Sequence, residues 1–350
     1  MEFLVLFILS IILSLFFIFV LFKIFYKFNI LDNPKKYWFK RKPIPYWVWI
    51  FFYINFFILS AIFIDINEKL ILIWIFWFLV TFVSFLDDLF DISAKIRLFL
   101  QILIWVVIWF TSIKIWYISN IFWWVLDLET YSFELFWQTW YIFPIILTTI
   151  WYILILNSLN WSDWVRGITT WVSWISYIII LLLAIKLLFI DDYSWSTQNA
   201  EFIIMISLIL IWSVLSFWYF DYKEKALMWD SWTMFLWFML ATLAIISWWK
   251  IATVSVVFWI YIIDSFYVIL WRIRNRKSPL NKDFTHLHHR LLDIWVSKNE
   301  ILIYIYSLSI IFWLTSLFLD KSWKILVFFI IVIVVFFLSN ILSKFKNKWK

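Results

Sequence analysis

The stretch FLDDLFDISAKIRLFLQ, residues 85–101, ends a long apolar run with a cluster of charged side chains. The cluster consists of Asp87, Asp88, Asp91, Lys95 and Arg97. A charge within the hydrocarbon region costs about 2.5 to 3.5 kcal/mol on insertion scales, so these acids lie in interfacial water or are kept for function. On a helix, side chains at i, i+1 and i+4 gather, which provides oxygen ligands for a hard cation or a base beside one. A solvated helix end is the alternative interpretation.

Composition places the whole chain in a membrane. Its 350 residues are 66% hydrophobic and 25% aromatic, which excludes a soluble globular domain, and the absence of cysteine excludes disulfides and thiolate metal sites. Eleven apolar runs approach the length of about 20 residues that crosses a bilayer. These runs are residues 3–22, 46–64, 70–86, 97–113, 140–156, 168–189, 201–220, 231–248, 252–271, 301–319 and 324–343. We therefore predict an all-α polytopic membrane protein with about eleven transmembrane helices, folded as one domain over residues 1–350, whose first run lacks the features of a cleaved signal peptide.

The distribution of basic residues predicts the orientation. With eleven spans, all but six of the 29 Lys and Arg residues fall on the side that holds the C-terminus. The six on the other side are Lys69, Lys114, Lys186, Lys250, Lys321 and Lys324. The positive-inside rule then places the N-terminus outside and the C-terminus in the cytoplasm. The net charge of +7 is an inner-leaflet feature and gives no ground for nucleic-acid binding.

Glycine and tryptophan usage is reversed relative to ordinary proteins. The chain has 1 Gly and 31 Trp, whereas glycine usually makes up about 7% of residues and lets membrane helices approach closely. We hypothesise that most of these Trp are glycine, encoded by UGA in a genome that assigns this codon to glycine. A genuinely Trp-rich protein is the alternative. UGG codons at Trp47, Trp164 and Trp229 would refute the hypothesis.

A second polar cluster, NSLNWSDWVRGITTW at residues 157–171, lies on the predicted cytoplasmic side. Asn157, Asn160 and Asp163 recur at three-residue spacing, so they can share one face of a helix. With glycine in place of the Trp after Asp163, backbone amides near Arg166 can approach an anion closely. An asparagine-capped helix end is the alternative.

The remaining polar motifs follow the later apolar runs. Lys225 and Asp230 are the polar anchors of DYKEKALMWDSWTMFLW, residues 221–237. Asp264 is an acid within an apolar run, which indicates either a functional site or pairing with a neighbouring helix. All three histidines of the chain lie in the next loop and are followed by Arg290. Because the chain has no cysteine and carboxylates lie nearby, we interpret these residues as hydrogen-bond donors to phosphate and not as metal ligands. They are His286, His288, His289 and Arg290. Residues 114–139 alternate in polarity and predict short strands on the outer surface.

Taken in order, these motifs resemble a known enzyme family. FLDDLFDISAKIRLFLQ, NSLNWSDWVRGITT, ALMWDSWTMFLW and RKSPLNKDFTHLHHRLLDIW look like successive signatures of the bacterial polyprenyl-phosphate N-acetylhexosamine-1-phosphate transferases, glycosyltransferase family 4. The resemblance covers residues 29–299, leaves the two C-terminal spans at 301–343 outside, and is greater for the N-acetylglucosamine branch than for the muramoyl-pentapeptide branch. Where that family has glycine, this chain has Trp47, Trp49, Trp164, Trp171, Trp229, Trp232, Trp237 and Trp295.

The resemblance implies transfer of a sugar-1-phosphate, N-acetylglucosamine-1-phosphate or a similar N-acetylhexosamine, from a UDP-sugar to undecaprenyl phosphate. UMP would be released, at the start of cell-envelope glycan synthesis, on the cytoplasmic side of the bacterial inner membrane. It implies Asp87, Asp88 and Asp163 as catalytic residues, with Mg²⁺, or Mn²⁺ in its place, on Asp163 and Asp88. The implied substrate-binding residues are Lys95, Arg97, Asn157, Asn160, Arg166, Lys225, Asp230, His286, His288, His289 and Arg290. A homodimer is compatible with this assignment.

The chain departs from the family pattern at three positions. Arg166 stands where the family usually has a second acid, and Tyr37 and Lys40 stand where it usually has Arg and His. A cation at 166 would bind the donor diphosphate, alter the choice of sugar or reduce activity. The competing function classes are a transporter that uses Asp264 as its midplane site and a membrane scaffold without catalysis.

The orientation is directly testable with topology reporters. A reporter fused after Lys350 or within residues 273–285 should report the cytoplasm, because the basic loops lie on that side. A reporter within residues 115–135 should report the outside. The reverse pattern would contradict the charge distribution and would separate the acidic and histidine loops from cytoplasmic nucleotide sugars.

Overall fold

We describe the protein from a computed structural model. The structure describes residues 1–32, 34, 42–90, 92–108, 111–119, 125–135, 138–160, 166–190, 194–226, 230–247, 251–278, 286–293, 297–318, 323, 326–327, 329–330, 332–333 and 336–337. Several predictions of the sequence therefore lie outside the described residues. These concern Tyr37, Lys40, Asp91, Asp163, Trp164, Trp229, Trp295 and most of the run 324–343.

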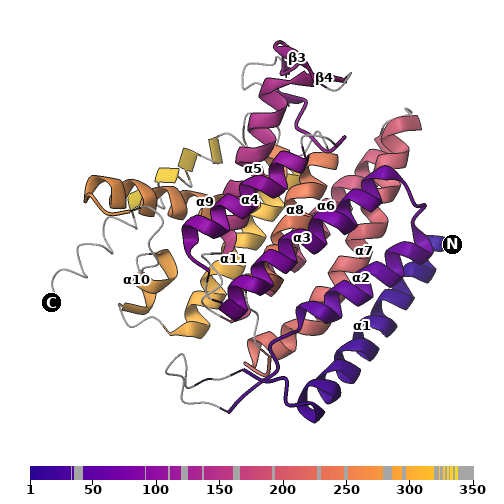
Figure 1. Cartoon of the computed structure of the whole chain (residues 1–350), viewed down its shortest axis with the longest axis vertical. Coiled ribbons are helices and arrows are strands. Elements are labelled where there is room, and N and C mark those ends of the chain that lie inside the picture. The colour runs from indigo at the N-terminus through magenta and orange to yellow at the C-terminus, as the bar shows by residue number, and fades with distance from the viewer. Residues whose placement is uncertain are drawn as a thin grey trace. The chain divides into compact units, whose positions relative to one another are not determined.

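The described chain is mainly helical (Figure 1). Its helices are α1 (Glu2–Lys27), α2 (Trp49–Phe63), α3 (Glu68–Phe90), α4 (Ala94–Ile108), α5 (Ile142–Asn160), α6 (Ile168–Ile190), α7 (Ser194–Tyr222), α8 (Asp230–Ile246), α9 (Ile251–Arg274), α10 (Leu287–Asp293) and α11 (Lys298–Phe318). Between α4 and α5 lie two antiparallel hairpins, β1 (Tyr117–Ser119) with β2 (Val125–Asp127), and β3 (Ser132–Leu135) with β4 (Gln138–Tyr141). The short strands predicted in this region are confirmed, and their place outside the membrane stays a prediction.

Apolar run lengths predicted the helices well. Each of the first ten predicted spans coincides with a helix, because a backbone in hydrocarbon must satisfy its hydrogen bonds internally. Within the described residues, five helices are long and apolar enough to cross a membrane: α1, α3, α5, most of α6 and most of α7. The helical membrane protein is therefore supported, whereas the number of eleven spans and the orientation stay predictions.

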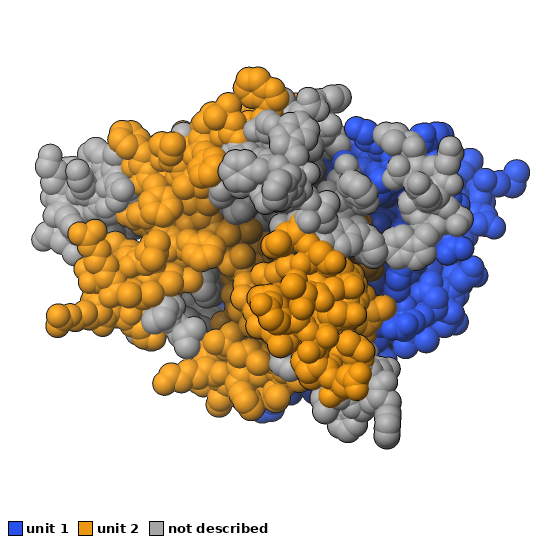
Figure 2. Space-filling model, turned by 90° about the horizontal axis from the view of Figure 1, so that it is seen from above, with its two compact units in different colours: residues 1–91, 166–240 blue, residues 92–165, 241–350 orange. Residues whose placement is uncertain are grey.

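The chain forms two compact units, coloured blue and orange in Figure 2. Unit 1 contains Met1–Asp91 and Arg166–Leu240, and unit 2 contains Ile92–Val165 and Ala241–Lys350. Each unit is built from stretches that are far apart in sequence, so neither is a continuous segment of the chain. The single domain predicted over residues 1–350 stays a prediction.

Unit 1 is held together by polar side chains between its helices. Figure 1 shows α1, α2 and α7 side by side, and they pack on one another. The Asn55 amide on α2 donates to Ser14 Oγ on α1 at 3.0 Å and to Ser213 Oγ on α7 at 2.7 Å. All three side chains are buried. Such interhelical hydrogen bonds fix register where lipid supplies no hydrophobic force between helices.

Unit 2 uses similar contacts. Tyr152 on α5 hydrogen-bonds with Thr242 Oγ1 on α8 at 2.9 Å, and the Trp151 indole donates to the Ala241 carbonyl at 3.1 Å. Helix α9 packs against both α5 and α11. These contacts tie the second stretch of unit 2 to the first and place α9, which carries Asp264, beside α5.

Several tryptophans fit poorly in these cores. The rings of Phe52 and Trp232 have their centroids 3.2 Å apart at a tilt of 34°, whereas packed aromatic pairs normally lie about 4.5 to 7 Å apart. The two rings therefore compete for the same volume. Trp232 is 1% exposed, so its ring has no room to move outward.

Buried indole nitrogens give a second sign of misfit. Among the described residues, five have an indole N–H that is buried and without a hydrogen-bond partner: Trp47, Trp77, Trp174, Trp212 and Trp232. A buried donor left unsatisfied costs about 1 to 3 kcal/mol. Both signs support the glycine hypothesis at these positions. The backbone does not add to it, because the chain's one glycine, Gly167 at φ 88°, has a positive φ and the described Trp do not.

The glycine hypothesis predicts that Trp232→Gly raises the melting temperature of the detergent-solubilised protein. The replacement would relieve the overlap with Phe52 and remove one unsatisfied donor. Trp323→Gly is the control, because Trp323 is 58% exposed and should change the melting temperature little. If Trp232 were the native residue, its removal would create a cavity and cost about 3 to 5 kcal/mol. A lowered melting temperature would therefore contradict the hypothesis at this position.

Candidate functional site

Asp87 and Asp88 lie near the C-terminal end of α3, which is predicted to face the cytoplasm. Asp87 is buried at 6% exposure and Asp88 is half-buried. The backbone N–H of Ser231, at the start of α8, donates to Asp88 Oδ2 at 3.2 Å, and the Ser231 hydroxyl also hydrogen-bonds with Asp88. Asp230, the first residue of α8, is close enough for its carboxylate to repel that of Asp88. Two acids about 140 residues apart in sequence therefore meet within unit 1.

This pair of acids fits a divalent cation. Two carboxylates brought together in a partly buried place repel each other, and a bound cation relieves that repulsion. Among the described residues, no group of three or more His, Cys, Asp or Glu side chains could hold a metal ion. A cation at Asp88 and Asp230 would keep several waters, which is the usual state of Mg²⁺ in proteins. The family resemblance had implied Asp163 and Asp88 as metal ligands and Asp230 as a substrate-binding residue, and Asp163 lies outside the described residues.

A second buried acid in unit 1 escaped the sequence interpretation. Asp221, near the end of α7, is 1% exposed. Its Oδ2 accepts hydrogen bonds from the Gly167 N–H at 2.9 Å and from Thr170 Oγ1 at 2.8 Å, at the start of α6. Arg166 lies close enough for its charge to stabilise the Asp221 carboxylate. The charge of Arg166, which departs from the family pattern, is thus matched by an acid of the protein itself.

Lys225 follows α7 and lies on the surface. Its Nζ donates to the Tyr219 hydroxyl at 3.0 Å and lies 4.6 Å from the centre of that ring. These contacts hold Lys225 against its own helix. Its predicted contact with substrate stays a prediction.

In unit 2, the predicted polar residues of α4 and α5 differ in how far they are exposed. Asn157 on α5 donates to Gln101 Oε1 on α4 at 3.0 Å and to the Ile153 carbonyl at 2.8 Å. Asn160, the last residue of α5, is half-buried. On α4, Lys95 is exposed, whereas Arg97 is buried. The structure brings Asn157 to α4 but does not test its role toward substrate.

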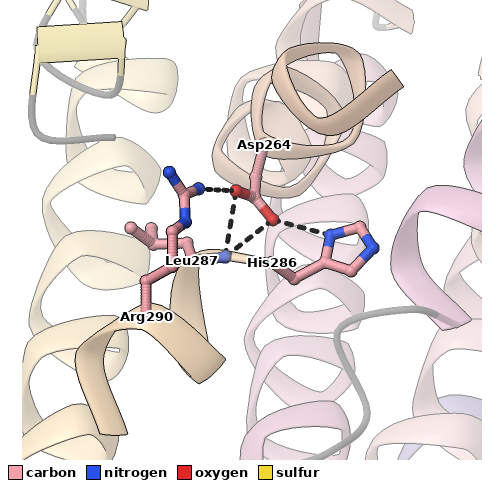
Figure 3. A network of polar contacts seen from close by, with 4 residues as sticks. All are labelled: Asp264, His286, Leu287 and Arg290. Carbon is pink, nitrogen blue, oxygen red and sulfur yellow. Dashed lines mark hydrogen bonds and ion pairs between the residues drawn. The ribbon is translucent and has the colours of Figure 1, made fainter. Parts of the chain in front are cut away.

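The histidine motif lies at α10, where a buried acid gathers its first residues (Figure 3). Asp264 on α9 accepts from His286 Nδ1 at 2.9 Å and from Arg290 Nη2 at 2.6 Å. The Leu287 backbone N–H also points at this carboxylate. Asp264 is thus paired with side chains near a neighbouring helix, which was one of the two interpretations that the sequence allowed. His288 and His289 lie in α10, but their side chains are outside what the structure describes.

Comparisons with known proteins agree on one family. Residues 70–248 match the family described as "Glycosyl transferase family 4". Over 271 residues the chain is 25% identical to a Bacillus subtilis (strain 168) protein described as a probable undecaprenyl-phosphate N-acetylglucosaminyl 1-phosphate transferase. That alignment covers 75% of this chain and 70% of the relative. The family match runs from α3 to α8, so it includes Asp88, Asp230 and Asp221 and ends before Asp264 and the histidine motif.

The contacts of Asp221 predict a large loss of stability in Asp221→Ala. The change leaves the Gly167 N–H, the Thr170 hydroxyl and the Arg166 charge without their carboxylate, and breaking such a buried pair costs about 3 to 5 kcal/mol. Glu201→Ala is the control, because Glu201 lies exposed on the same helix. The melting temperature in detergent should fall clearly for Asp221→Ala alone. Equal melting temperatures for both variants would contradict the structural role of Asp221.

Proposed function

Because the chain belongs to glycosyl transferase family 4, we propose that it transfers a sugar-1-phosphate from a UDP-sugar to undecaprenyl phosphate and releases UMP. The name of the Bacillus subtilis relative supports undecaprenyl phosphate as the acceptor and N-acetylglucosamine, or a similar N-acetylhexosamine, as the sugar. The observation that carries the proposal is the meeting of Asp88 and Asp230 at helix ends inside the family match. The reaction would take place at the cytoplasmic face of the bacterial inner membrane and initiate a cell-envelope glycan.

The reaction joins two anions, so charge must be neutralised where they meet. We assign a Mg²⁺ site to Asp88 and Asp230, and Mn²⁺ would fit the same oxygen ligands. The metal role of Asp163, which the family resemblance implies, stays a prediction. When bound, the cation would neutralise phosphate charge and orient the donor diphosphate. Ser231, through its N–H and hydroxyl, holds the Asp88 carboxylate in place. This assignment moves Asp230 from the predicted substrate group to the metal group.

Asp87 serves a different purpose from Asp88. Adjacent residues of a helix point about 100° apart, so the two carboxylates face different directions. We assign Asp87 to the acceptor phosphate, which it orients. A phosphomonoester with a second pKa of about 6 is mostly a dianion at pH 7. An oxygen of the lipid phosphate can therefore attack the sugar-bearing phosphorus directly, as the bond from that phosphorus to UMP breaks and UMP leaves.

The predicted phosphate and uridine ligands remain part of the proposal, with one change. Arg166 is matched by Asp221, so we assign it to the fold around Gly167 and not to the donor diphosphate. The remaining predicted ligands are Lys95, Arg97, Asn157, Asn160, Lys225, His286, His288, His289 and Arg290. Their cationic and amide groups suit phosphate and uridine.

The transporter alternative loses its main residue. A midplane ion site at Asp264 needs carboxylate oxygens that are available to the ion, but donors from Arg290, Leu287 and His286 already bind both oxygens. The scaffold alternative conflicts with the family, whose members are named as transferases.

Asparagine variants of the acids test the assignment. Asp88→Asn, Asp163→Asn and Asp230→Asn each remove one anionic metal ligand, so UMP release should fall about 100-fold or more and recover in part at raised Mg²⁺. In Asp87→Asn, UMP release should fall by a comparable factor and should not recover at raised Mg²⁺, because this change affects the acceptor phosphate and not the metal. The assay measures UMP released from a panel of UDP-sugars with undecaprenyl phosphate, using protein with glycine at the suspect Trp positions.

Asp127→Asn is the matched control, since Asp127 is an exposed acid of the β1–β2 hairpin. It should retain the parent rate. Asp91→Asn should retain more activity than Asp87→Asn or Asp88→Asn. Parent rates in all the variants, at matched expression, would show that the acids are structural and would overturn the enzyme mechanism proposed above.

A further inference from the structure

Asp264 is the centre of a buried network that the transfer reaction does not itself require (Figure 3). The residue is 6% exposed, and its oxygens accept from three groups that all belong to the start of α10. Arg290 Nη2 lies 2.6 Å from Oδ1, and His286 Nδ1 lies 2.9 Å from Oδ2. The Leu287 N–H lies 3.0 Å from Oδ1 and 3.1 Å from Oδ2. A single carboxylate on α9 therefore holds the first turn of α10.

The contacts do for α10 what a capping residue does for an ordinary helix. The first N–H groups of a helix lack partners within the helix and are usually satisfied by a nearby side chain. Here the acceptor comes from another helix, 23 residues earlier in the chain than Leu287. A helix of seven residues is too short to be stable by itself. Its position therefore depends on such an external contact.

Asp264 binds a guanidinium and an imidazole at once. It forms a buried ion pair with Arg290, and His286 donates its Nδ1–H to the same carboxylate. In Figure 3 the imidazole lies on the opposite side of the carboxylate from the guanidinium. A carboxylate partner of this kind fixes both the tautomer and the orientation of an imidazole. The network thus sets the position of α10 and the orientation of the His286 ring together.

We infer that Asp264 is a positioning residue for the donor-binding step: it fixes α10 on α9 so that His286 is presented to the UDP-sugar. The inference rests on the proposed function, which assigns this histidine to the donor. It adds a residue outside the family match to the machinery. It also explains why an acid is retained within an apolar helix, where charge is otherwise costly.

Asp264→Asn tests the inference with little change of shape. The variant keeps an oxygen for the Leu287 N–H, but it removes the charge that holds Arg290 and presents an amide to His286. Loss of a charge-assisted contact of about 1.5 to 3 kcal/mol corresponds to a change of roughly 10- to 150-fold. We expect the KM for the UDP-sugar to rise by that factor, while kcat and the KM for undecaprenyl phosphate stay near the parent values.

A control variant separates positioning from a general loss of structure. Ser265→Ala, next to Asp264 and also buried, should leave the KM unchanged, because its hydroxyl has no hydrogen-bond partner in the described part of the chain.

Hydrogen–deuterium exchange gives a readout that does not depend on activity. In Asp264→Asn the amides of residues 287–293 should exchange faster, while those of α11 should not change. If the parent protein is active but Asp264→Asn leaves the KM for the UDP-sugar or the amide exchange of α10 unchanged, the inference about Asp264 is wrong. The proposed function would then still stand. A parent protein that releases no UMP from any UDP-sugar would overturn the proposed function.

Discussion

The structure depends on one constraint: an acid that leaves water must find its partners within the protein. Asp264 and Asp221 obtain them from the chain, the first from Arg290, Leu287 and His286, and the second from Gly167 and Thr170. Asp88 also accepts hydrogen bonds from the chain, from Ser231, but it differs from the other two because it lies beside a second carboxylate, that of Asp230. Such a pair is stable only if something positive relieves the repulsion or if a proton is bound. The partners of each acid therefore separate those that build the fold from those that are suited to a ligand.

The features that could be predicted from the sequence are those that depend on residues close together in the chain. Helix positions follow from the length of the apolar runs, and the β1–β4 hairpins follow from alternation over a few residues. The contact of Asp88 with the start of α8 was not predictable in this way, because it joins residues about 140 positions apart. Asp221 was missed although it directly follows the apolar run that ends at residue 220. The short helix α10 was missed because seven residues are too few for a clear helical period.

The packing of tryptophan bears on how the sequence itself should be understood. Indoles at interfaces are common in membrane proteins, but interfacial indoles keep their N–H in contact with polar groups. The nitrogens of Trp77, Trp212 and Trp232 are buried without such contact in the described chain. Membrane helices associate through small residues, so glycine at these positions would serve the packing that the helices require. The misfit is local to side chains, and the helices themselves agree with the apolar runs.

Arg166, which departs from the family pattern, lies beside an acid of the protein itself. If a cation replaced an acid facing the substrate, it would change the charge that the donor meets. In this chain the cation at 166 interacts with Asp221, which also accepts from Gly167 and Thr170 of the same turn. The Arg166 charge therefore faces a carboxyl group of the protein at the start of α6. In the proposed reaction the cation is therefore assigned to the acids at the end of α3 and the start of α8, and Arg166 is assigned to the turn at Gly167.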